Sequence, residues 1–203
     1  TDSFGKLVKE IRCGPFGSTV LSETYFEDGV ILARPFNIND FTLERDNLVY
    51  VSEKDVREKK LRIYDEGDIF FSRVGDVRCG IVPKFDSKIT ISPNIIAVRV
   101  DRAKINPYYV TIFFNTKYGF PQIERGLKVV AQPTIQTDLI SSLVIVELSD
   151  YFQTDIENIF RQYFDLDLRS IRLYSEAKQI LLSELGLLNW KPTHQLSFIK
   201  NFS

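Results

Sequence analysis

Few side chains in this sequence could carry out catalysis. Asp65, Glu66 and Asp68 form an acidic group, and carboxylate oxygens are the ligands that Mg²⁺ prefers. No lysine follows at the spacing of nucleases of the Asp…Glu-x-Lys type, and residues 69–71 have the composition of a buried strand, so we expect a solvated turn rather than a metal site. The only histidine, His194, lies near the C-terminus and leaves little for base catalysis or metal binding.

Two further segments resemble binding loops for phosphate or for a methylated base. Residues 14–19 read Gly-Pro-Phe-Gly-Ser-Thr and lack the lysine and the spacing of a P-loop, so a tight turn is favoured. Its hydroxyls on Ser18 and Thr19 could still contact a DNA phosphate, as could Lys84. Residues 106–109 lack the second proline of the adenine-methyltransferase motif, and no glycine-rich cofactor loop accompanies them, so Asn106 is predicted to cap a helix.

Basic and amide side chains in the expected loops could read nucleic-acid bases. Arginine and lysine pair with the guanine edge, asparagine and glutamine pair with adenine, and all of them can hold phosphates. Soluble proteins carry such residues everywhere, so a solvated surface stays open as the alternative for each. We give priority to the segment 125–136, which joins a helix end to a strand, and then to Arg34 and Arg73. The candidates are Arg34, Asn37, Arg73, Arg78, Arg125, Lys128, Gln132, Thr134 and Gln136.

The composition limits how such a protein could bind DNA. The chain has 203 residues, of which 44% are hydrophobic, enough for one core of ordinary domain size. It carries 26 Lys and Arg against 27 Asp and Glu, so a long-range positive field is excluded and DNA binding needs a local basic patch or a partner. Cys13 and Cys79 lie far apart, which favours reduced thiols over a disulfide.

The ends of the chain and its hydropathy give expectations about location. No run approaches the roughly 20 apolar residues of a membrane span, and no signal peptide is visible, so we expect a soluble cytoplasmic protein without membrane contact. The sequence starts at Thr1 and contains no methionine, so we expect it to be a piece of a longer protein.

The elements that must position these side chains indicate a strand-rich α+β domain with a few short helices. Four runs have strand composition, at 7–11, 68–71, 80–82 and 95–100, and Gly- and Asp-rich turns separate them. A helix is expected from Pro107 until Gly119 and Pro121 end it. A second short helix with Thr137 as its cap leads into a strand at 143–146.

The pattern changes at residue 149, where apolar residues begin to recur every three to four positions. This spacing predicts one helix to Gly186, roughly 55 Å long if it is unbroken at residues 165–168. Such a helix is longer than a small domain is wide, so part of its apolar stripe must pair with another helix in a coiled coil. The helix-pairing candidates are Ile156, Ile159, Tyr163, Leu166, Leu173, Ala177, Ile180 and Leu181. We therefore expect a domain at 1–148, a spacer helix at 149–186 and a linker at 187–203.

Several short motifs follow one another along the chain, at 14–18, 29–38, 67–75, 92–96, 106–109, 115–119 and 132–135, and a further one lies at 173–187. Taken in order, these motifs resemble those of type I restriction-modification specificity subunits, and residues 173–187 are similar to the conserved spacer region of that family. The likeness covers nearly the whole chain, and the order and spacing of the motifs carry it.

The resemblance implies a DNA target-recognition domain that reads one half of a bipartite site, with a helix that sets the distance between half-sites. It implies no catalysis by this chain and no cofactor bound to it. An adenine methyltransferase subunit would bring S-adenosylmethionine, and a restriction and translocation subunit would bring ATP and Mg²⁺. A second recognition half would follow in the same longer chain or come from a homodimer, because this chain has one domain and one helix.

Two other classes of function stay open from the sequence. One is a self-contained DNA methyltransferase or nuclease fragment, which would modify or cut DNA without partners. The other is an adaptor that binds no DNA and recruits a partner through its coiled coil.

Overall fold

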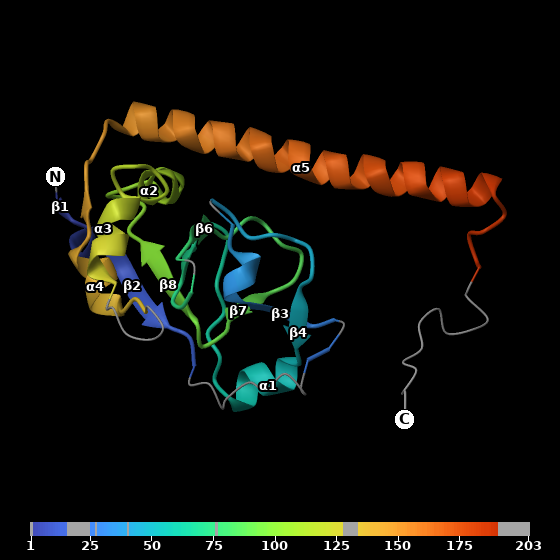
Figure 1. The fold of residues 1–203 in the computed structure, drawn as a ribbon, viewed down its shortest axis with the longest axis horizontal. Helices are drawn as coiled ribbons and strands as arrows, with labels where there is room; N and C mark the ends of the chain where they lie inside the picture. Colours follow the sequence, from blue (N-terminus) through green and yellow to red (C-terminus); the bar gives the residue numbers. More distant parts are fainter. Residues whose placement is uncertain are drawn as a thin grey trace, which may run out of the picture. The chain divides into compact units, whose positions relative to one another are not determined.

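The computed structural model describes residues 2–15, 25–26, 28–39, 41–75, 77–127 and 134–190. The chain divides into two compact units, Thr1–Phe160 and Arg161–Ser203. The first unit contains the sheets and the short helices, and helix α5 (Asp150–Glu184) begins in it and continues into the second (Figure 1). This arrangement confirms the predicted α+β class with a long C-terminal helix. No helix in these ranges combines the length and the apolar character needed to cross a bilayer.

A four-stranded antiparallel sheet forms the centre of the first unit. Its order is β2-β8-β5-β6, built from β2 (Val8–Cys13), β8 (Ile95–Val100), β5 (Ile69–Ser72) and β6 (Cys79–Ile81). Strands β5, β6 and β8 confirm the predicted runs at 68–71, 80–82 and 95–100 to within about one residue. The first predicted strand is shifted toward the C-terminus, because Leu7 belongs to the 3₁₀ helix η1 (Phe4–Leu7) and is buried there.

A second sheet has three strands in the order β4-β3-β7. The central strand β3 (Val30–Ala33) pairs antiparallel with β4 (Val49–Val51) and parallel with β7 (Ile89–Ile91). Helix α1 (Glu53–Glu58) follows β4, and the Ser52 hydroxyl accepts a hydrogen bond of 3.0 Å from the Asp55 amide at its start. A separate pair joins β1 (Asp2–Ser3) to β9 (Val144–Ile145).

The alternation of side chains explains why the two larger sheets stack. In β8, Ile96 and Val98 join the core on the side of the helices, whereas Ile95 and Ala97 join the core between the sheets. Strand β3 divides in the same way between the core shared with the other sheet and the core under α1. Strands buried on both faces need apolar residues at every position, which is why they appear in the sequence as continuous apolar runs.

Three short helices cover the outer face of the four-stranded sheet. Helix α2 (Pro107–Phe114) begins as predicted, with the Asn106 side chain accepting a hydrogen bond of 2.9 Å from the Tyr108 amide. The predicted end at Gly119–Pro121 is wrong, since α2 ends at Phe114 and Pro121 lies in the first turn of α3 (Phe120–Gly126), where a missing N–H costs nothing. Helix α4 is Thr137–Ser142, and its N-cap is Gln136 rather than Thr137.

The first turns of α5 are anchored on the globular unit by polar and aromatic contacts. The Gln153 side chain accepts a hydrogen bond of 2.9 Å from the Asn106 amide and donates one of 2.8 Å to the Leu148 carbonyl. The Phe160 ring packs 5.4 Å from the Tyr108 ring. Gln153 and Phe160 are the two buried residues of α5, and hydrophobic periodicity did not single out either as an anchor. The helix is continuous through residues 165–168, so the break left open from the sequence does not occur.

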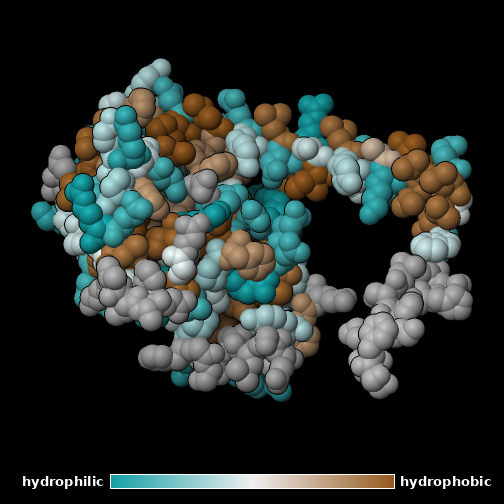
Figure 2. Space-filling model, viewed as in Figure 1, coloured by the Kyte–Doolittle hydropathy of each residue, from teal (hydrophilic) through white to brown (hydrophobic). Residues whose placement is uncertain are grey.

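Most of the predicted helix-pairing residues lie exposed on α5. Ile156 is the exception, because it packs against the core of the globular unit. Figure 2 shows hydrophobic side chains at several places along the surface of α5. Pairing of this helix with another stays a prediction. The exposed candidates are Ile159, Tyr163, Leu166, Leu173, Ala177, Ile180 and Leu181.

Candidate nucleic-acid interface

Several strand ends meet at one end of the stacked sheets. The Gly14 amide, after β2, donates to the Ile95 carbonyl at 2.9 Å, and the Arg73 amide, after β5, donates to the Asn94 carbonyl at 2.8 Å. The Ser92 amide, after β7, donates to the Ala33 carbonyl at the end of β3 at 2.9 Å. A Cβ on Gly14 would lie 1.9 Å from the Ser92 carbonyl oxygen, so this close approach requires glycine.

Four arginines lie at these strand ends, and we call this region the basic end. Arg12 is the penultimate residue of β2. Arg34 follows β3, Arg73 follows β5 and Arg78 precedes β6. Three of the four were predicted as DNA-binding candidates from sequence, and the pairing of the strands now brings them to one end of the fold. Arg12 was not predicted, and it forms an ion pair with Glu10 at 2.7 Å.

Arg34 is held by aromatic rings and a carbonyl group. Its guanidinium carbon lies 4.5 Å from the centre of the Phe36 ring and 5.8 Å from that of Tyr25. One terminal nitrogen, Nη2, donates a hydrogen bond of 2.9 Å to the Asn47 carbonyl. These partners of Arg34 were not predicted from the sequence. Phe36 is two residues away in the sequence, but only the tertiary structure brings Tyr25 and Asn47 to Arg34.

Arg73, Arg78 and Thr134 come together from distant parts of the sequence. Val74 and Thr134 form an antiparallel β-bridge, and the Ile135 amide donates to the Arg73 carbonyl at 3.0 Å. The Arg78 amide donates to the Ser72 hydroxyl at 2.7 Å. The end of the predicted segment 125–136 therefore lies beside the turn between β5 and β6.

Asn37 has a structural role that the sequence did not reveal. Its side chain is fully buried, so in this conformation it cannot reach a base edge. Its Oδ1 accepts a hydrogen bond of 3.0 Å from the Arg34 amide, and its own amide donates to the Arg34 carbonyl at 2.9 Å. Asn37 therefore fixes the backbone of Arg34.

The remaining candidates are more scattered. Gln136 is exposed and follows Ile135 directly, near Arg73. Arg125 is exposed in the last turn of α3, and no contact among the described residues joins it to the basic end. Arg78 precedes β6, whereas Lys84 follows it, at the opposite end of the strand. Ser18, Thr19, Lys128 and Gln132 lie outside the described residues, as does His194.

The opposite end of the four-stranded sheet carries the acidic group, and we call it the acidic end. Asp68 is buried, so the expectation of a wholly solvated turn is wrong for this residue. Arg99 donates from Nε to Asp68 at 2.7 Å and from Nη2 to Asp65 at 2.9 Å. These carboxylates raise the pKa of Arg99 above its ordinary value, chiefly through the hydrogen bond to Asp68. The acidic residues therefore neutralise an arginine.

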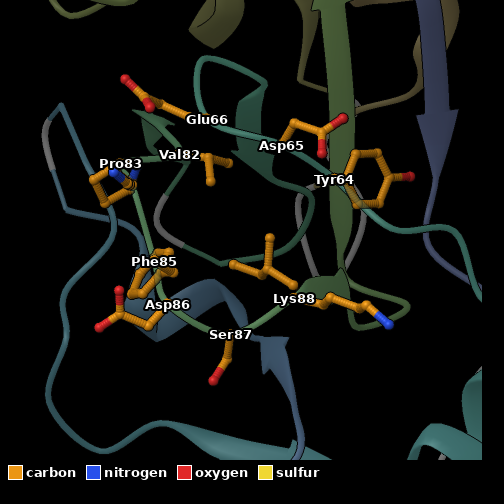
Figure 3. Close-up of a pocket in the computed structure, with 11 residues that line it drawn as sticks. Tyr64, Asp65, Glu66, Val82, Pro83, Phe85, Asp86, Ser87 and Lys88 are labelled. Atoms are coloured by element: carbon orange, nitrogen blue, oxygen red, sulfur yellow. The ribbon is translucent and has the colours of Figure 1, made fainter.

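Lys84 lines a pocket at the acidic end, away from the candidates at the basic end. The pocket has a volume of about 240 Å³ and is lined by residues 64–66 and 82–89. Asp65, Glu66 and Asp86 contribute carboxylates to its lining, and Lys88 extends to the opposite side from Glu66 (Figure 3). Lys88 pairs with Glu53 at 2.9 Å. Such a lining does not favour a polyanion.

The described residues contain no group of three His, Cys, Asp or Glu side chains that could hold a metal ion. Cys79 is fully buried, and burial raises the pKa of its thiol, so its nucleophilic thiolate is disfavoured. Among the described residues, Arg34 at the basic end is oriented by rings and a carbonyl, whereas Arg99 at the acidic end is paired with carboxylates.

The fold resembles solved structures from restriction-modification systems. A chain from a study of complex assembly and conformational transition of the type I system aligns with a TM-score of 0.53 and 15% identity, covering 91% of this chain and 43% of that one. The HsdS subunit from Thermoanaerobacter tengcongensis aligns with a TM-score of 0.50 and 14% identity, covering 91% and 42%. The type IIG restriction endonuclease BpuSI aligns over 75% of this chain and 25% of its own, with a TM-score of 0.53 and 12% identity.

No family model and no curated protein sequence matches the chain. At these identities the structural likeness shows the fold alone. The chain spans 42% of the length of the HsdS subunit and 43% of the other type I chain. The fold shared with these proteins is therefore a part of each of them.

Proposed function

We propose that this chain is a sequence-specific DNA-recognition component of a type I-like restriction-modification system. It reads one half of a bipartite site and docks an adenine methyltransferase subunit, and it has no catalytic activity of its own. The observation that carries the proposal is the convergence of Arg34, Arg73, Arg78 and Thr134 at one end of a fold shared with an HsdS subunit.

The charge distribution supports a division of labour between subunits. With 26 basic and 27 acidic residues, the chain has no excess positive charge to neutralise many phosphates. The basic end can supply base contacts, and partner subunits supply most of the phosphate contacts. The chain alone should therefore bind DNA weakly and with a shallow dependence on salt.

The exposed apolar side chains of α5 are proposed to pair with a second helix, from the same longer chain or from another copy. Burying this face gives the second recognition half a fixed position, and so the helix sets the spacing of the half-sites. Leu173→Asp with Ile180→Asp should abolish pairing, as measured by light scattering of the complex. The two residues are 53% and 65% exposed, so the globular unit should keep its unfolding transition.

The test of the function is to express the chain with a cognate methyltransferase subunit and to map modified adenines across a genome. A single recurring motif would support the proposal. A stable complex that modifies adenines without any motif would refute sequence recognition, and methyl transfer or Mg²⁺-dependent cleavage by the purified chain alone would refute the non-catalytic role.

A further inference from the structure

Arg34 is held by aromatic rings and a backbone carbonyl rather than by a carboxylate. Phe36 and Tyr25 contact its guanidinium through their rings, and the Asn47 carbonyl accepts from Nη2 at 2.9 Å. No carboxylate among the described residues pairs with it. Aromatic faces and a carbonyl orient a guanidinium without cancelling its full positive charge. The Arg34 side chain is thus fixed in place and still available to an electron-rich ligand.

The backbone beneath Arg34 is fixed as well. Asn37 accepts from the Arg34 amide at 3.0 Å and donates its own amide to the Arg34 carbonyl at 2.9 Å. Since Asn37 is fully buried, this contact is shielded from water. An arginine whose backbone and side chain are both held loses little conformational entropy on binding, which favours a contact with defined geometry over a general attraction.

The surface next to Arg34 can accommodate the edge of a base pair. A depression of about 330 Å³ lies there, lined by Pro35, Phe36, Ile38, Val74 and Arg78. Phe36 is 51% exposed, so its ring faces solvent beside the depression as well as contacting Arg34. The apolar lining can contact the methyl group of a thymine or the carbon edge of a cytosine, while Arg34 can donate to the acceptors of a purine.

We propose that Arg34 is a specificity-determining residue that reads a guanine in the major groove, with Phe36 as the platform that orients it. Terminal N–H groups of the guanidinium would donate to O6 and N7 of the base, the pair of acceptors that guanine alone presents in this geometry. This inference rests on the proposed DNA-recognition function and adds the base and the residue that reads it. From the sequence alone, Arg34 could contact either a base or a phosphate.

The test compares methylation motifs from complexes containing wild-type chain, Arg34→Lys or Phe36→Leu. Lysine keeps the charge but loses the planar fork, so one guanine of the wild-type motif should become degenerate while every other position is kept. Discrimination at that position, measured by binding to oligonucleotides with single-base substitutions, should fall about ten- to a hundredfold. Phe36→Leu keeps the apolar volume and loses the aromatic face, so it should relax the same position to a smaller degree.

Arg57→Lys is the matched control, because Arg57 is an exposed arginine on α1 that pairs with Glu53 and lies outside the proposed contacts. It should leave the motif unchanged. Urea unfolding of each complex component checks that Arg34→Lys and Phe36→Leu remain folded.

Four results would overturn the assignment. An unchanged motif in Arg34→Lys would refute base reading. Equal weakening of all sites by Arg34→Ala, with a salt slope reduced by about one, would make Arg34 a phosphate contact instead. A wild-type motif without guanine would refute the assignment while leaving DNA recognition intact, whereas a wild-type complex without any motif would refute both.

Discussion

Arg99 at the acidic end and Arg34 at the basic end of the stacked sheets are held in different ways. At the acidic end, Arg99 donates to Asp68 and Asp65, and both carboxylates are within hydrogen-bond distance. At the basic end, Arg34 contacts the rings of Phe36 and Tyr25 and the carbonyl of Asn47. Both side chains are fixed, but only the first is neutralised.

This difference separates a stabilising arginine from one that can bind a ligand. A buried carboxylate such as Asp68 needs a cation, so the ion pair belongs to the stability of the fold. Aromatic and carbonyl partners orient Arg34 and leave its charge for an outside group. The type of residue does not distinguish the two roles, whereas the chemistry of the partners does.

The largest effect is expected on the free energy of unfolding when the buried Asp68 carboxylate at the acidic end is removed. Asp68→Ala leaves Arg99 without its main partner and removes the acceptor for the Asp65 amide, which lies 2.9 Å away. The free energy of unfolding should fall by about 2–4 kcal/mol, less than for a fully buried pair because Arg99 is partly exposed. Urea unfolding measures this change. Asp65→Ala is the control and should cost under about 1 kcal/mol, since the Asp65 side chain is 76% exposed. Equal losses would contradict the difference in burial.

The next effect tests how the basic end is built. Asn37→Ala removes the acceptor for the Arg34 amide, so unfolding should become easier by about 1–3 kcal/mol. The same variant should make the methylation motif degenerate at the position assigned to Arg34, although the Asn37 side chain is buried in this structure. A stability loss with an intact motif would show that Arg34 keeps its position without Asn37.

A third change would convert the basic end into an arrangement like that of the acidic end. Phe36→Glu places a carboxylate beside Arg34 at a position that is 51% exposed, so the fold should tolerate it. Neutralising Arg34 and adding negative charge should weaken DNA binding by the assembled complex roughly tenfold or more, as measured by fluorescence anisotropy. Phe36→Gln is the control for the loss of the ring without added charge. Equal weakening by both variants would assign the effect to the ring alone.

The smallest effect concerns Tyr64, which lines the pocket at the acidic end. Burial raises the pKa of Tyr64 from 10.0 to about 12, so its neutral form is favoured in the folded state. This contribution to stability is present below pH 10, the unfolded value, and is lost as pH rises toward 12. Urea midpoints of wild type should therefore fall over this range more than those of Tyr64→Phe.

Near pH 7 the Tyr64→Phe variant should be within about 1 kcal/mol of wild type, because the buried hydroxyl has no hydrogen-bond partner among the described residues. Tyr118→Phe, at a 69% exposed position, controls for general alkaline unfolding. A parallel fall in the wild type and in Tyr64→Phe would show that another group titrates instead.

Local patterns in the sequence were sufficient for part of this fold. The buried strands β5, β6 and β8 were predicted because apolar runs between Gly and Asp turns leave few alternatives, and the start of α2 followed from Asn106 and Pro107. The end of α2 was mispredicted because Pro121 both stops one helix and suits the first turn of the next. Among candidate site residues, exposure could not be read from residue type, so buried Asn37 was grouped with accessible arginines.

The sequence by itself determined the α+β class, the long helix and the balance of charges, because these depend on periodicity and composition. Only the tertiary structure decided which charges remain available. Asp68 and Arg99 are 31 positions apart, and Arg34 and Asn47 are 13 apart. Strand pairing and sheet stacking bring such distant groups within a few ångströms, and at that range the choice of partner determines whether an arginine stabilises the fold or stays ready to bind.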